Sequence, residues 1–116
     1  MKFEIYQISL TDEMVMVLNS RMSLEQIAEH SPKCLAHRDT MLGKNLEQHF
    51  KDGHYSLVAR IEAENLNQVF EIGNVGPEDQ ITHIAPMHSV SVGDVILDEN
   101  GVFHTVDSFG FGVINP

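Results

Sequence analysis

Stretches in which every second residue is hydrophobic predict several half-buried β-strands. Near-alternation of apolar and polar residues in the first ten positions predicts a strand over residues 2–9. A more regular alternation predicts a second strand over residues 55–62. The chain ends in a β-rich tail, in which we expect three further strands, over residues 88–98, 102–107 and 109–114.

Helices are predicted by apolar residues at three- and four-residue spacing and by capping residues. Ser23 and Gln26 form a capping box, which begins a helix that we expect to end before Pro32. Apolar residues at four-residue spacing, followed by Gly53, predict a second helix over about residues 42–51.

Three other segments have weaker patterns. A short amphipathic helix is expected over residues 66–73, with a glycine and an asparagine as its C-terminal signal. Residues 74–87 contain prolines and little periodicity, so we interpret them as a long loop. Residues 13–19 fit a strand or a helix, and their β-branched Val15 and Val17 favour a strand.

A hairpin is predicted within the tail at Asn100-Gly101, because this dipeptide suits the positive φ angles of a type I′ turn. If these two residues form the turn, Asp94 lies opposite Asp107. Like charges directly opposite each other are unfavourable. The two carboxylates would then hold a cation or a basic side chain, or share a proton. Alternatively, Gly93 introduces a bulge, the strands splay, and both carboxylates lie in solvent.

These elements predict an α+β fold with a mostly antiparallel sheet, about three short helices and a C-terminal β-hairpin or meander. The length of 116 residues suits a single domain over residues 1–116. No apolar run approaches the roughly 20 residues of a membrane-spanning helix. The single cysteine, Cys34, excludes an internal disulfide framework and fits a reducing compartment. We therefore expect a small, soluble, cytoplasmic protein.

Among the bulk properties, the net charge excludes the most classes of binding partner. Seventeen acidic against seven basic residues give a net charge of −10. Residues 1–60 hold all seven Lys and Arg, whereas residues 61–116 hold nine acids and no Lys or Arg. Proteins bind nucleic acids and anionic membranes through clustered Lys and Arg side chains. Because residues 61–116 have none, we do not expect this half of the chain to bind either directly. The negative charge would attract a protein partner with a basic surface. Alternatively, it only keeps the protein soluble.

Seven histidines raise the hypothesis of a metal site. The candidate ligands closest together in the sequence are His30, Cys34 and His37, since imidazole and thiolate are zinc ligands. However, Pro32 interrupts the helix that would place them on one side, and no fourth ligand is evident. The pairs His49-x4-His54 and His83-x4-His88 lack the four-residue helical spacing of zinc enzymes. We therefore assign no cofactor.

The usual catalytic motifs are missing. No serine lies in a Gly-x-Ser-x-Gly elbow, and Gly73-x2-Gly76 and Gly110-x-Gly112 lack the strand–turn–helix context of a phosphate-binding loop. Cys34 near His37 is more simply interpreted as a buried thiol than as a nucleophile. The sequence therefore predicts a protein that is not an enzyme.

Two blocks of the tail resemble a known family. Ser-Val-Gly-Asp at residues 91–94 and Asp-Ser-Phe-Gly-Phe at residues 107–111 lie on either side of the Asn100-Gly101 turn. Together with the strand and helix that precede them, they resemble the YodL-like domain, over about residues 55–114. Proteins of this family are carried by plasmids, phages and integrative elements of bacteria. The resemblance thus implies a mobile-element context, but no agreed activity and no catalytic residues.

We therefore expect a small acidic, non-enzymatic accessory protein of a mobile genetic element. It would act by binding a protein partner with a basic surface, such as a host nucleic-acid enzyme. A small zinc-binding protein or metal-dependent enzyme, and a nucleic-acid-binding module, stay open as alternatives, and pairing of edge strands would allow a homodimer. The expected interaction surface consists of Glu78, Asp79, Asp94, Asp98, Glu99 and Asp107.

Overall fold

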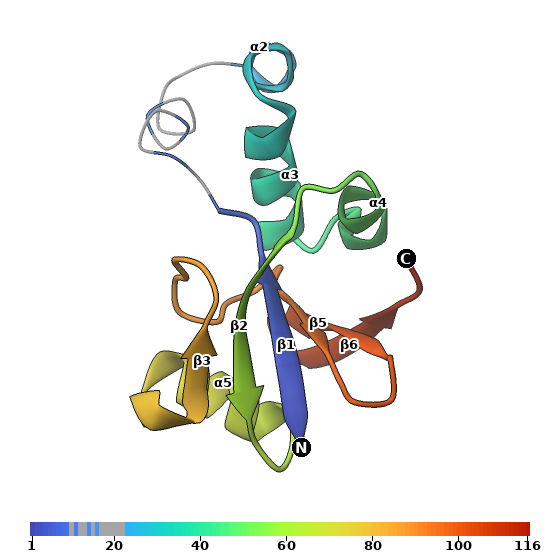
Figure 1. Ribbon diagram of the computed structural model, residues 1–116. Coiled ribbons are helices and arrows are strands. Elements are labelled where there is room, and N and C mark those ends of the chain that lie inside the picture. Colours follow the sequence, from blue (N-terminus) through green and yellow to red (C-terminus); the bar gives the residue numbers. More distant parts are fainter. Residues whose placement is uncertain (10, 12–13, 15, 17–22) are drawn as a thin grey trace.

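The structure is a computed structural model, which describes the chain except for residues 10, 12–13, 15 and 17–22 (Figure 1). Its strands are β1 (Lys2–Gln7), β2 (Ser56–Glu62), β3 (Ile81–His83), β4 (Val95–Leu97), β5 (Phe103–Asp107) and β6 (Gly110–Ile114). Its helices are α2 (Leu24–His30), α3 (Pro32–Met41), α4 (Leu46–Lys51) and α5 (Leu66–Asn74), with a 3-10 turn, η1 (Glu78–Gln80). In this part of the chain, no helix has the length and apolar character needed to cross a membrane.

The six strands of the described residues form one antiparallel sheet in the order β3-β2-β1-β4-β5-β6. The first strand lies inside this sheet, between β2 and β4, so the start of the chain pairs with the tail. The predicted α+β fold with a mostly antiparallel sheet is confirmed, as are the strands expected over residues 2–9 and 55–62.

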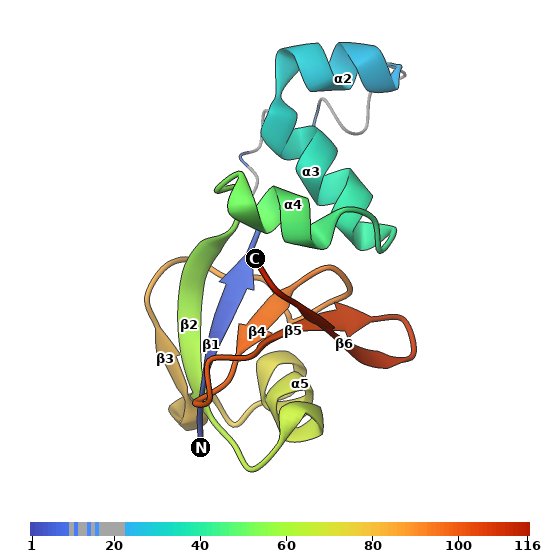
Figure 2. The same cartoon turned by 90° about the vertical axis from the view of Figure 1, so that its right-hand side faces the viewer.

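Helices cover the two faces of the sheet at opposite ends (Figure 2). Successive residues of a strand point to opposite faces, and the neighbours Val95 and Ile96 accordingly enter different cores. The core beneath α5 contains Ile5, Ile61, Val69, Ile72, Val90 and Ile96, among others. On the other face, the core beneath α3 and α4 contains Ile8, Ala36 and Val95 with the rings of Tyr6, Phe50, Tyr55 and Phe103.

The helical part differs from its prediction because Pro32 begins a helix as well as following one. The capping box at Ser23 and the end of α2 before Pro32 are confirmed. Ser31 then ends α2 and also caps α3, since its hydroxyl accepts a hydrogen bond from the Cys34 N–H. Proline is favoured at the first position of a helix because its missing N–H is not needed there. Because α3 runs to Met41, the helix predicted over residues 42–51 begins later, at Leu46.

Two interpretations of the C-terminal half are also wrong. Residues 74–87 are not a plain loop, because they contain η1 and β3, which pairs with β2. Three residues are too few to show alternation, so this strand depends on its backbone pairing. Of residues 88–98, only Val95–Leu97 form a strand.

The strand prediction for residues 13–19 rests on Val15 and Val17, which lie outside the described residues.

The hairpin is present, but its register is shifted by one residue. Val95 pairs with Thr105, and the Asp98 N–H donates to the Val102 carbonyl at 3.0 Å. The loop therefore has three residues, with Gly101 at φ +81°, instead of two. The cause is the Asp98 carboxylate, which accepts hydrogen bonds from the N–H groups of Asn100 and Val102. A one-residue slip changes which side chains share a face.

Candidate acidic binding grooves

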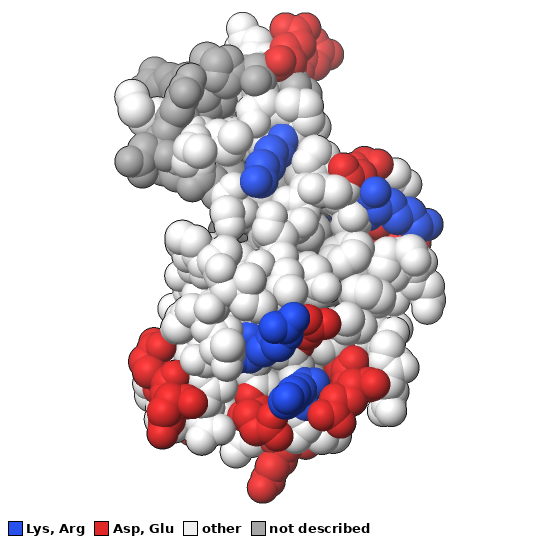
Figure 3. All heavy atoms as spheres, viewed as in Figure 1, with Lys and Arg blue, Asp and Glu red and all other residues white. Residues whose placement is uncertain are grey.

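Acidic side chains gather at the end of the sheet where β1 begins and β2 ends, with basic side chains among them (Figure 3). Two grooves open at this end and share Met1 and Glu64 in their walls. We call them the α5 groove and the hairpin groove. Among the described residues that line them, neither contains a Lys or Arg.

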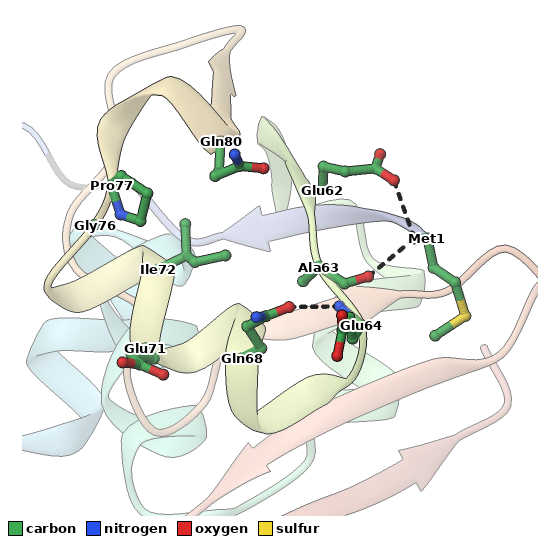
Figure 4. Close-up of a pocket in the computed structure, with 10 residues that line it drawn as sticks. All are labelled: Met1, Glu62, Ala63, Glu64, Gln68, Glu71, Ile72, Gly76, Pro77 and Gln80. Atoms are coloured by element: carbon green, nitrogen blue, oxygen red, sulfur yellow. Dashed lines mark hydrogen bonds and ion pairs between the residues drawn. The ribbon is translucent and has the colours of Figure 1, made fainter.

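The α5 groove has a volume of about 410 Å³ and lies between the end of β2, α5 and the turn that precedes β3 (Figure 4). Its acidic residues are Glu62, Glu64 and Glu71. Amides and apolar groups complete it: Gln68, Gln80, Met1, Ala63, Ile72, Gly76 and Pro77. Ile72, which is mostly buried in the core beneath α5, supplies an apolar floor.

A short connection from β2 to α5 positions these side chains. Asn65 caps α5 by accepting a hydrogen bond from the Gln68 N–H at 2.8 Å. The Gln68 side chain in turn accepts a hydrogen bond from the Glu64 N–H at 2.6 Å, so the first turn of α5 is tied to the end of β2. Gln68 therefore lies between Glu64 and Glu71, and all three residues line the groove (Figure 4).

The carboxylates of the α5 groove differ in their partners. Glu62 lies 3.0 Å from the Met1 ammonium nitrogen, in an exposed ion pair. Within the described part of the chain, no hydrogen bond or ion pair involves the carboxylates of Glu64 and Glu71, and both residues are exposed. Two of the three negative charges are thus available to a ligand.

The hairpin groove, of about 450 Å³, uses its charges differently. The Asp98 carboxylate lies 2.8 Å from His104 Nε2, and this hydrogen bond holds the pKa of Asp98 below its usual range. Glu99 accepts a hydrogen bond from the Lys2 backbone N–H at 2.7 Å. The carboxylates of Asp98 and Glu99 are therefore engaged in hydrogen bonds within the protein. Phe3, Leu66 and Phe111 form the apolar part of the groove wall.

The residues expected to form one acidic surface lie in several places. Asp98 and Glu99 line the hairpin groove. Glu78 and Asp79 lie in η1, next to the α5 groove, and Glu78 pairs with His83 at 2.9 Å. Asp107 lies at the β5–β6 turn and accepts a hydrogen bond from Thr105 Oγ1.

Asp94 does not belong to the surface, because it is only 4% exposed. Its carboxylate accepts hydrogen bonds from Gln7 Nε2 at 3.0 Å and from the Ser91 N–H at 2.9 Å. Burial raises its pKa to about 6. The corrected register also places Asp94 opposite Val106, so the pairing expected with Asp107 is wrong. The alternative, in which both carboxylates lie in solvent, holds for Asp107 but not for Asp94.

Sequence reasoning missed the glutamates of the α5 groove. Glu62 and Glu64 are two residues apart at the end of the predicted strand, and Glu71 lies in the next predicted helix. In an extended chain, this two-residue spacing places the first two glutamates on one side. Only the packing of α5 against β2, however, brings Glu71 to the same groove.

The first metal hypothesis receives no support from the described residues. Cys34 is fully buried, and its Sγ contacts the Met14 carbonyl at 3.6 Å. Burial lowers the pKa of His37, which lies on the same helix, and the side chain of His30 lies outside the described part of the structure. Over that part, the group of three ligand residues that lie close together contains none of these three.

No match was found between this chain and any family model, curated protein or solved structure. Function is therefore inferred from the chemistry of the grooves.

Proposed function

We propose that the protein acts by binding a partner protein, without catalysis, and that the partner places a lysine or arginine side chain in the α5 groove. The observation that carries this proposal is the combination of three glutamates with an apolar floor in one groove. Lysine and arginine have an apolar stem and a cationic head, which match these two features. The stem lies on Ile72, and the head lies between Glu64 and Glu71.

The charge distribution supports a partner with a basic surface. Seven of the nine acids after residue 60 are exposed, and no Lys or Arg follows Arg60. A field of one sign steers an oppositely charged partner into place and repels nucleic-acid backbones and anionic membranes. Enzymes that process nucleic acids have basic surfaces, and the resemblance to YodL-like proteins leads us to propose such a cytoplasmic host enzyme as the partner of a mobile-element protein.

The proposal is tested with two double variants of equal net charge. Glu64→Gln with Glu71→Gln removes both available charges of the α5 groove. Glu25→Gln with Glu29→Gln removes two exposed charges of α2 and is the control. The probe is a peptide of alternating lysine and alanine, and its affinity is measured by fluorescence anisotropy at two ionic strengths.

The groove variant is expected to bind the peptide about fivefold to tenfold more weakly than the wild type, since exposed charge pairs contribute roughly 0.5–0.7 kcal/mol each. The control is expected to change the affinity by less than about twofold, and added salt should weaken wild-type binding. An equal loss in both variants would show that net charge, rather than the groove, attracts the peptide. Proteins captured by the wild type and the control, but not by the groove variant, are the candidate partners.

A further inference from the structure

The end of α4 brings two histidines and an aspartate together. One ligand atom each from His49, Asp52 and His54 lies within 4.8 Å of the others. The two imidazole rings have their centroids 5.7 Å apart. His49 and His54 were set aside in the sequence because they lack the four-residue helical spacing of zinc enzymes, but the structure brings their rings together at the end of α4.

The histidines meet because α4 ends in a Schellman motif. The N–H of His54 donates to the His49 carbonyl at 3.2 Å, and the N–H of Gly53 donates to the Phe50 carbonyl at 3.1 Å. Gly53 adopts φ +80°, the left-handed conformation that this motif requires. The two side chains that the motif brings into contact are usually hydrophobic. Here both are imidazoles, and Asp52 caps the helix beside them.

A carboxylate on the neighbouring helix orients the ring of His49. Its Nε2 lies 3.0 Å from Asp39 Oδ2. A carboxylate accepts hydrogen bonds, so Nε2 carries a proton, and in the neutral ring the lone pair is then on Nδ1. A carboxylate behind the imidazole orients the histidine ligands of many metal sites.

The other nitrogen of this ring supplies an independent observation. Nδ1 of His49 is buried and has no hydrogen-bond partner among the described residues. A buried nitrogen without a partner is costly and calls for an explanation, such as an ion. The ring is 13% exposed, whereas Asp52 is exposed and its Oδ1 accepts a hydrogen bond from Gln48 Nε2 at 2.9 Å. A metal ion at this site would therefore use the other carboxylate oxygen of Asp52 or displace the Gln48 amide.

We propose that His49, Asp52 and His54 bind a divalent transition-metal ion of the zinc class. Two imidazoles and one carboxylate are common zinc ligands, and three protein ligands leave a fourth position for water or another donor. In a tetrahedral site, ligand atoms about 2.0–2.1 Å from the ion lie about 3.4 Å from one another, so rotation of side chains is enough to close the site. The carbonyl end of α4 also favours a cation.

The test uses the full chain, stripped with a chelator, and Zn²⁺ or Co²⁺ alone as the probe. Titration calorimetry is expected to show one Zn²⁺ per chain. His54→Gln and Asp52→Asn should each weaken binding at least about tenfold, and both residues are accessible enough for the fold to persist. His83→Gln, which replaces an exposed histidine elsewhere, should leave binding unchanged.

Two spectra complete the experiment. The Co²⁺ complex should lack a sulfur-to-metal charge-transfer band, and Zn²⁺ should shift the Nδ1 resonance of His49 in a long-range ¹H–¹⁵N spectrum. Absence of Zn²⁺ binding, or equal binding by the His54→Gln variant and the wild type, would overturn the proposal. Loss of Zn²⁺ binding in Cys34→Ser would also overturn the proposal, because it would show that the ion binds at α3 through Cys34.

Discussion

The sheet with α5 and the helical part that comprises α2, α3 and α4 position their polar side chains by different means. In the sheet, pairing between distant segments decides which carboxylates meet, as at the α5 groove, where β2, α5 and the turn before β3 converge. In the helical part, caps and turns within a few residues do so, as at the end of α4. These two arrangements underlie our two proposals, a groove for a basic partner in the first region and a metal site in the second.

The two regions meet where the loop at Gly93 packs against the end of α3. The Tyr55 hydroxyl donates to the Gly93 carbonyl, and the loop at Gly93 lies against the backbone of Thr40 at the end of α3. Nearby, Gln7 Nε2 donates to both Asp94 and the His88 carbonyl. These hydrogen bonds fix the Gly93 loop on the sheet, and the close approach of Gly93 to Thr40 packs the loop against α3.

The largest effect is expected from Gly93→Ala. A Cβ atom there would lie 2.7 Å from the Thr40 backbone, and the residue has φ +93°. Strain and overlap together should lower the free energy of unfolding by about 2–5 kcal/mol. Gly101→Ala is the matched control, because it also has positive φ but nothing within 4 Å of the new atom, and should cost about 1–2 kcal/mol. Urea unfolding measures both, and equal losses would show that the contact with Thr40 does not matter.

A smaller and pH-dependent effect is expected at Asp94. Its pKa is about 6 in the folded state against 3.8 as the ordinary value, so the folded state binds the proton more tightly. The resulting stabilisation is complete below about pH 4 and is lost as the pH rises to about 6. Relative to Asp94→Asn, the wild type should therefore lose up to about 3 kcal/mol of unfolding free energy over this range. A difference that stays constant with pH would contradict the assignment.

The smallest effects separate the two regions directly. Asn65→Ala and Ser23→Ala each remove a helix cap and should each cost about 1 kcal/mol. Asn65→Ala loosens α5, which carries Glu71, and should weaken binding of the lysine peptide. Ser23→Ala should leave peptide binding unchanged and increase amide exchange within α2 alone. If both variants change peptide binding alike, the groove does not depend on the order of α5.

Local patterns predicted much of the fold, and they failed where two physical effects competed. Alternation identified β1 and β2, and a capping box identified the start of α2. Pro32 was interpreted only as a stop, although Ser31 caps a new helix there. The hairpin register was wrong because the Asp98 side chain competes for backbone N–H groups and lengthens the loop.

The candidate sites were less predictable than the fold. The charge count identified an acidic half, but not that Asp94 is buried or that Asp98 pairs with His104. The α5 groove depends on tertiary packing that no short motif reveals. The contact at the end of α4 could have been predicted from the sequence. Gly53 directly precedes His54, and His49 lies five residues before His54, which is the spacing of a Schellman contact.

The most direct test of the α5 groove is a titration of the protein with the lysine peptide, followed by ¹H–¹⁵N amide spectra. We predict that the largest shifts fall on Glu62, Glu64, Gln68, Glu71 and Gln80, that α2 and α3 stay unchanged, and that salt reverses the shifts. Shifts spread evenly over all acidic residues, or confined to the helical part, would contradict a binding site in this groove.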